Sequence, residues 1–249
     1  MLSLTAVVLV ILIGSCLQRV SGLGLGLVAG PVLSVVMGPV EGILVVNLLA
    51  VLNAALLTWT VRAGIDWRKF ALIGAMLIFG AVPGALLITV VSASLLQVIV
   101  GATLLVALAV VTFFAGHIPQ LQGRGPALLA GVAGGFMNTL AGIAGPAMTV
   151  YAQASRWEQN SFSATLQPIF LVAGLLSVTV KLLTGAATFQ HTDGWVWPLG
   201  VLGMVAGISL GGILTRRVAK HRARRLALIL ATAGAVVALV RGLGGLVTG

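Results

Sequence analysis

Residue types that carry covalent, metal or proton-relay chemistry are scarce in this chain. Cys16 is its only cysteine, so one chain can form neither an internal disulfide nor a multi-cysteine metal site. The acidic residues and histidines all fall at the ends of apolar segments or in the connections between them: Glu41, Asp66, Glu158, Asp193, His117, His191 and His221. The sequence therefore predicts no metal centre, no cofactor, no hydrolase triad in the membrane core and no enzymatic activity.

Charge of either sign is also rare. Only 7% of the residues are charged and 59% are hydrophobic, and the mean hydropathy is +1.18. Apolar runs of about 20 residues recur, the length that crosses a bilayer core as a helix. The sequence thus predicts an all-α integral membrane protein. Its net charge of +10 comes from basic residues between the apolar runs, where they set topology, so no nucleic-acid binding is expected.

Six apolar segments are long enough to span the membrane without interruption. They are residues 42–61, 70–90, 95–115, 161–183, 195–215 and 226–246. Two further apolar regions, 2–38 and 126–155, are each broken near the middle by glycine and polar residues. Each region is predicted to form a broken helical hairpin, in which two helices meet at a turn.

One short motif occurs in both broken regions. Ala29-Gly30-Pro31-Val32-Leu33-Ser34-Val35 reappears as Ala144-Gly145-Pro146-Ala147-Met148-Thr149-Val150. The segments that follow align as well, because Gly80-Ala81-Val82-Pro83-Gly84 matches Gly207-Ile208-Ser209-Leu210-Gly211. We therefore expect two repeats, 1–122 and 123–249, each a re-entrant or broken hairpin followed by three transmembrane helices.

Loop charges indicate that the two repeats are inverted in the membrane. Loop 62–69 of repeat one is basic and loop 90–94 is neutral, whereas the corresponding order in repeat two is reversed. Because basic loops stay on the cytoplasmic side, equivalent loops lie on opposite faces. This predicts cytoplasmic loops at 62–69, 116–125 and 216–225, both termini outside, and two hairpins that enter from opposite faces.

Duplicated helix breaks point to a substrate site. Unpaired backbone at membrane depth is tolerated only where protein or a water-filled cavity covers it, so the two turns are expected to meet near the midplane. Helices that restart there, with Pro31 and Pro146 in their early turns, would direct amides and a positive dipole end at an anion. The candidate binding residues are Ser21, Gly22, Gly24, Gly26, Asn47, Asn138, Thr139, Gly142 and Gln167.

Two cations lie close to these segments. Arg19 stands between the halves of the first broken region, where it is either a substrate ligand or a residue at the membrane surface. Lys181 is near the end of segment 161–183, and we expect its side chain to reach the membrane surface. Glycines and small polar residues also pack helices together, so a purely structural role for any one of them stays open.

The two glycine-rich breaks resemble those of a known family. Ser21 to Gly26 leads to Pro31, Gly134 to Gly142 leads to Pro146, and three spans follow each break. This pattern covers essentially the whole chain and resembles the TauE/SafE sulfite exporter family of bacterial membrane proteins. The resemblance implies secondary transport of a small sulfur-containing anion, such as sulfite, a sulfonate or sulfoacetate, across the cytoplasmic (inner) membrane.

Other functions remain open at this stage. The same helix ends would suit an anion channel, and glycine-lined helices would suit a membrane-embedded scaffold or assembly protein. The expected partners are the anion and membrane lipids. The sequence does not determine which anion is carried, whether protons or sodium are coupled, the direction of transport or the oligomeric state.

Overall fold

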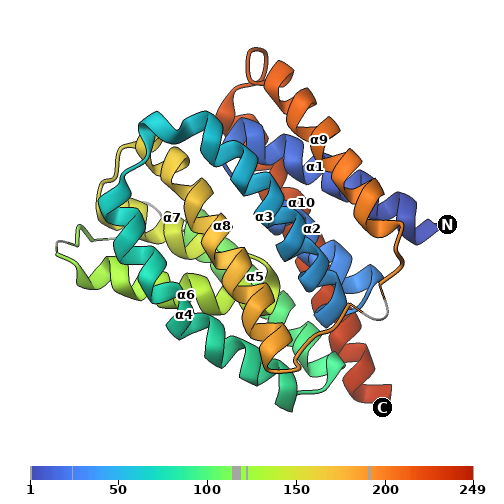
Figure 1. Cartoon of the computed structure of the whole chain (residues 1–249). Helices are drawn as coiled ribbons and strands as arrows, with labels where there is room; N and C mark the ends of the chain where they lie inside the picture. The colour runs from blue at the N-terminus through green and yellow to red at the C-terminus, as the bar shows by residue number, and fades with distance from the viewer. Residues whose placement is uncertain (1, 24, 114–118, 122, 190–191, 249) are drawn as a thin grey trace.

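The computed structural model describes residues 2–23, 25–113, 119–121, 123–189 and 192–248. This part of the chain is a bundle of helices, which confirms the all-α prediction (Figure 1). The helices are α1 (Leu2–Ser21), α2 (Leu25–Val36), α3 (Pro39–Val61), the 3-10 turn η1 (Arg62–Gly64), α4 (Trp67–Val90), α5 (Ala93–Phe113), α6 (Gly125–Ala141), α7 (Gly145–Ala154), α8 (Gln159–Leu183), α9 (Val196–Leu214) and α10 (Lys220–Thr248).

Seven of the described helices, α1, α3, α4, α5, α8, α9 and α10, are long and apolar enough to cross a membrane. The protein is therefore a multi-pass membrane protein. The six segments expected to span correspond to the last six of these helices. The largest difference is that α10 begins at Lys220 rather than at residue 226, so most of the basic run is helical. By contrast, α2 has 12 residues and α7 has 10, which at 1.5 Å per residue is too short to cross.

Both predicted helix breaks are present. After α1, Gly22 has a φ of 81° and donates its amide to the carbonyl of Gln18 at 2.8 Å. After α6, Gly142 has a φ of 71° and donates its amide to the carbonyl of Asn138 at 2.9 Å. Backbone in this left-handed region is accessible to glycine and strained for other residues, so these two glycines end their helices.

The two proline positions differ. Pro146 lies in the first turn of α7, as expected, where a missing amide hydrogen costs least. Pro31 lies in the middle of α2, because that helix already begins at Leu25. The prediction that Pro31 lies in an early turn is therefore wrong, because the helix begins further from Pro31 than expected. A proline at this depth in a helix removes one backbone hydrogen bond.

Contacts between helices define their relative directions. Arg19 of α1 donates to Thr60 of α3, so these two helices end at the same end of the bundle. The contact between Gly131 of α6 and Ile73 of α4, and that between Gly84 and Thr139 further on, show that α4 and α6 run parallel. Figure 1 shows α4 and α6 side by side at one edge of the bundle and α1 and α9 at the opposite edge.

The pair α6–α7 has the geometry of a re-entrant hairpin. Leu121, which precedes α6, donates its amide to the carbonyl of Ala154 at the end of α7, at 2.9 Å. The hairpin therefore opens at the end of the bundle where α4 begins and where α1 ends. Because α1 starts at the other end, the pair α1–α2 opens in the opposite direction.

Candidate functional site

The two helix breaks meet inside the bundle. A Cβ atom placed on Gly26, the second residue of α2, would overlap the carbonyl oxygen of Gly142 at the end of α6. One turn further, a Cβ atom on Gly30 would lie 2.6 Å from the carbonyl oxygen of Ala141. The absence of side chains at both positions lets the backbones cross in contact, and it brings the start of α2 against the break between α6 and α7.

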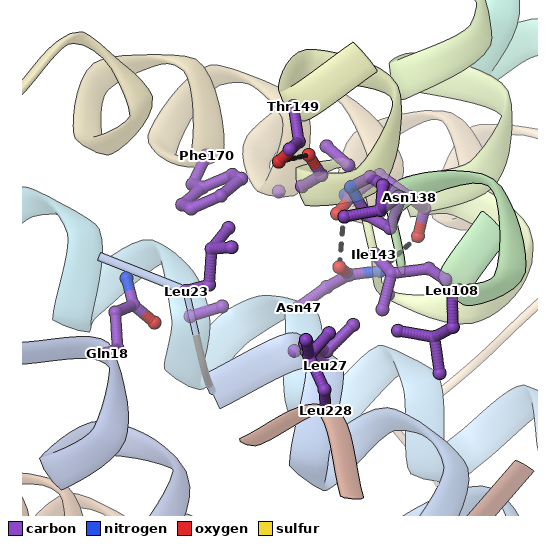
Figure 2. A pocket seen from close by; sticks show the side chains of 18 residues that line it. Gln18, Leu23, Leu27, Asn47, Leu108, Asn138, Ile143, Thr149, Phe170 and Leu228 are labelled. Atoms are coloured by element: carbon purple, nitrogen blue, oxygen red, sulfur yellow. Dashed lines mark hydrogen bonds between the residues drawn. The ribbon is translucent and has the colours of Figure 1, made fainter. Parts of the chain in front are cut away.

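A cavity of about 40 Å³ lies beside this crossing (Figure 2). A volume of this size holds a few water molecules. Asn47 of α3 and Asn138 of α6 face one another at the cavity, while Leu23 and Phe170 belong to its apolar wall. Seven helices (α1, α2, α3, α5, α7, α8 and α10) and the break between α6 and α7 contribute the remaining lining residues: Gln18, Gly26, Leu27, Ala50, Leu108, Val111, Gly142, Ile143, Ala144, Gly145, Pro146, Thr149, Gly174 and Leu228.

Two helix N-termini border the cavity. Gly26 and Leu27 belong to the first turn of α2, and Gly145 belongs to the first turn of α7. Amides in a first turn have no carbonyl within their own helix to bind, and the aligned peptide dipoles make these ends positive. The hydroxyl of Thr149 donates back to the carbonyl of Gly145 at 2.9 Å. Backbone amides, rather than charged side chains, are thus the groups at this cavity that are suited to binding an anion.

Asn47 connects three helices at the cavity. Its Oδ1 accepts from Nδ2 of Asn138 at 3.1 Å, and its Nδ2 donates to the hydroxyl of Ser177 in α8 at 2.7 Å and to the backbone carbonyl of Asn138 at 3.4 Å. All three side chains are buried. Because these bonds join three helices, the cluster holds the end of α6 at a fixed position against α3 and α8.

Gln18 separates this cavity from a second one. Its Oε1 accepts from the amide of Leu25 at 3.2 Å, and its Nε2 donates to Oε1 of Gln167 at 3.0 Å. On the far side of this pair lies a cavity of about 270 Å³. Arg19, Ser21, Gly22, Gln167 and Lys220 are among the residues that line it.

A third cavity borders the central one at Thr149. It has a volume of about 330 Å³, and its lining includes Arg156, Gln159 and Arg224. Both neighbouring cavities therefore contain two basic side chains and touch the central cavity through one polar residue. Both also lie at the end of the bundle that carries the basic connections. The electrostatic potential along these approaches favours anions.

The residues predicted for the site divide into separate groups. Gly26, Asn47, Asn138 and Gly142 line the central cavity, and Arg19, Ser21, Gly22 and Gln167 line the second. Ser21 stabilises the turn itself, because its hydroxyl donates to the carbonyls of Leu17 and Leu23. Thr139 is fully buried against Gly84 and lines neither cavity. Gly24 lies outside the described residues.

Sequence reasoning missed Gln18 as a site residue and misplaced Lys181. Gln18 is a buried amide directly before Arg19, and an uncharged polar residue in an apolar helix was a signal that could have identified it. Lys181 does not reach the membrane surface: its side chain is 0% exposed. The connection after α8 folds back over this turn, where the amide of Ala187 donates to the carbonyl of Lys181 at 3.3 Å.

The described residues contain no group of three or more histidine, cysteine, aspartate or glutamate side chains arranged to hold a metal ion. The central cavity presents amides, carbonyls, hydroxyls and apolar surface. These groups can bind and orient a small anion by hydrogen bonds. The described residues that line it include no nucleophile with an adjacent general base.

The comparison with protein families agrees with this architecture. The model of the family described as sulfite exporter TauE/SafE matches residues 7–240, which include both helix breaks and nearly all of the described helices. No curated protein and no solved structure gives a significant match. The match extends over most of the chain, and the chain therefore belongs to the sulfite exporter TauE/SafE family.

Proposed function

We propose that the protein is a secondary transporter that carries a small sulfur-containing anion, of the sulfite, sulfonate or sulfoacetate type, across the bacterial cytoplasmic membrane. The observation that carries this proposal is the convergence of two helix N-termini, those of α2 and α7, on one polar cavity. The family is one of membrane transporters of sulfur anions, and the geometry suits that class of substrate. Gly26, Asn47, Asn138 and Gly142 form the binding site in this proposal.

The same proposal assigns an entrance to the anion. Arg19 and Lys220 line the second cavity, and Arg156 and Arg224 line the third. We assign this end of the bundle to the cytoplasm because its connections are basic, which places both termini outside. Gln18 and Gln167 then form the contact that closes the central cavity from one entrance. Alternating access requires this contact to open while the opposite side closes.

Counterflow in proteoliposomes tests the transport mechanism. Vesicles loaded with unlabelled sulfite or isethionate are diluted into a trace of the labelled anion, with the membrane potential clamped at zero by valinomycin and equal potassium concentrations on both sides. A transporter that alternates between the two sides transiently concentrates the label inside. An anion channel only equilibrates it, so equilibration without overshoot would support the channel and contradict alternating access.

A charge substitution tests the site. Asn138→Asp places a carboxylate in the central cavity and is expected to abolish counterflow, because a fixed negative charge repels the anion. Gln97→Glu is the matched control: Gln97 is also buried, donates to the carbonyl of Ser34 at 3.2 Å and lies outside the cavity. We expect this control to retain transport. Equal losses in both variants would show that the effect is not specific to the site.

Ligand-dependent stabilisation separates a transporter from a scaffold. A protein whose glycines only pack helices gains no stability from any of these anions, whereas a specific binder is stabilised once the ligand exceeds its dissociation constant. Thermal unfolding of the purified protein is therefore followed with sulfite, sulfate, thiosulfate, sulfonates and carboxylates. A shift confined to one anion class identifies the substrate class, and the absence of any shift favours the scaffold.

A further inference from the structure

Among the described residues, none that lines the central cavity is charged, although the proposed substrate is an anion. Bringing a charge to this depth without a counter-charge is costly. One helix of the cavity wall does carry a buried amine. α8 contributes Phe170 and Gly174 to the lining, and two turns beyond Gly174 it carries Lys181, whose side chain is 0% exposed.

The register of α8 places Lys181 on the side of the helix that faces the site. Gly174, Ser177 and Lys181 are spaced by three and four residues, so they share one face. Gly174 and Ser177 both contact α3 at Asn47. A Cβ atom on Gly174 would lie 3.2 Å from the backbone carbonyl oxygen of Asn47, and the hydroxyl of Ser177 accepts a hydrogen bond from the side-chain Nδ2 of Asn47. Because helical side chains lean toward the N-terminus, the Lys181 side chain leans toward Ser177.

The Lys181 amine is unpaired within the described residues. Its Nζ has no hydrogen-bond partner, and the ion pair found in this part of the chain, Lys69 with Asp66, is elsewhere. The hydroxyl of Thr139 is another buried polar group without a partner among the described residues. Thr139 packs on Gly84 of α4, and Val180, next to Lys181, packs on Ala81 and Ala85 of the same helix.

The elements that pack against α8 bring few other charges to this level. The opposite end of α8 is marked by the contacts of Asp66 with Thr165 and of Tyr151 with Trp157. The basic residues of the neighbouring elements lie at that end: Arg62, Arg68, Lys69 and Arg124. At the Lys181 end, Glu41 in the first turn of α3 is half-buried and forms no ion pair within the described residues. Asp193 is exposed and caps α9 through the amide of Trp195 at 3.0 Å. An anion in the cavity would therefore be the main new partner for a charge on Lys181.

We propose that Lys181 is the proton-coupling residue of this transporter, so that each anion is carried together with one proton. When the anion enters the central cavity, the lone pair of Nζ takes a proton from a hydronium ion on the same side, so that an N–H bond forms as an O–H bond breaks. When the anion leaves on the other side, this N–H bond breaks and the proton passes to a water molecule there. Anion and proton cross as a neutral pair, and each makes the presence of the other in the protein less costly. This inference rests on the proposed function.

Proton uptake on anion binding tests the inference directly. Methanesulfonate is the probe, because the anion of a strong acid neither takes up nor releases protons itself. It is added to weakly buffered, detergent-solubilised protein, and the pH change is recorded beside the amount bound. We expect wild-type protein to take up about one proton per bound anion, and its dissociation constant to rise about tenfold per pH unit where Lys181 is neutral in the free protein.

Two substitutions assign the proton to this residue. Lys181→Met should take up no proton and bind methanesulfonate weakly, and Lys181→Arg, which stays charged, should bind it with an affinity independent of pH. Lys69→Met, at a lysine paired with Asp66, is the control and should behave as wild type. Proton uptake by the wild-type protein tests the coupling even if a variant does not fold. Binding without proton uptake, or unchanged uptake in Lys181→Met, overturns the coupling role alone; no binding of any anion overturns the proposed function as well.

Discussion

Gly26 of α2 and Gly142 at the end of α6 are so close that the carbonyl oxygen of Gly142 occupies the place where a side chain on Gly26 would begin. The two residues are far apart in sequence and belong to different hairpins. Their contact brings the starts of α2 and α7 to one cavity. The site therefore depends on the absence of two side chains at the crossing as much as on the presence of the asparagines.

Substitution at this crossing should be costly. Gly26→Ala is expected to lower stability by about 1–3 kcal/mol, because the backbone of one hairpin must move away from the other. Gly212→Ala is the control, since Gly212 is also helical and a Cβ there meets no atom within 4 Å. Thermal unfolding in detergent compares the two. A Gly26→Ala protein as stable as the Gly212→Ala protein would show that the hairpins do not cross in contact.

The Asn47–Asn138 pair should behave as a coupled unit. Asn138→Leu leaves Oδ1 of Asn47 buried without its donor, which costs about 1–3 kcal/mol. Asn47→Leu removes the same bond and also leaves Ser177 without a donor. The double variant is expected to lose less stability than the sum of the single variants. A double-mutant cycle on unfolding free energies measures this difference, and strict additivity would contradict the bond.

The N-cap of α8 should make stability depend on acidity. The carboxylate of Glu158 accepts from the amides of Asn160 and Ser161 at 2.8 and 2.7 Å, and these bonds lower the pKa of Glu158 below its ordinary value of 4.5. The folded state thus binds this proton less readily than the unfolded state. The contribution is complete above about pH 4.5 and is lost as the pH falls through the folded-state pKa.

Glu158→Gln tests this cap. Its melting temperature is expected to lie below that of the wild type at neutral pH, and the difference should shrink as the pH falls below about 4.5. Because Glu158 is exposed, added salt should also reduce the difference. Melting curves across this pH range provide the measurement. A constant difference at every pH would show that the carboxylate charge contributes nothing.

Local signals in the sequence predicted most of the fold. The apolar runs predicted the long helices, and the glycine-rich motifs predicted both breaks, because the left-handed backbone at Gly22 and Gly142 depends on glycine itself. Asn47 and Asn138 were predicted as site residues because amide side chains beside such breaks would complete the set of hydrogen-bonding groups around an oxyanion. The division into two inverted repeats stays a prediction. The opposite directions of the two hairpins support it.

Contacts between distant helices could not be predicted in the same way. The bond from Gln18 to Gln167 depends on the register of two helices whose residues are 149 positions apart. Lys181 was expected at the surface because α8 ends two residues later, at Leu183. The structure buries it, since the following connection folds back toward the helix. Burial at a helix end depends on tertiary packing, which the hydropathy of one segment does not describe.

The basic residues at the entrance should affect substrate capture rather than stability. Arg19→Gln and Lys220→Gln remove positive charges from the second cavity and are expected to raise the KM for a sulfonate severalfold at low ionic strength. The effect should fade in high salt, because exposed charges are screened over about 10 Å at 0.1 M ionic strength. Arg62→Gln is the control: Arg62 is exposed, packs over Trp59 at 4.4 Å and does not line this cavity. Initial uptake rates, measured at a low and a high salt concentration, give the KM values that test this prediction. An equal rise of KM in Arg62→Gln, or a rise unaffected by salt, would rule out steering by Arg19 and Lys220.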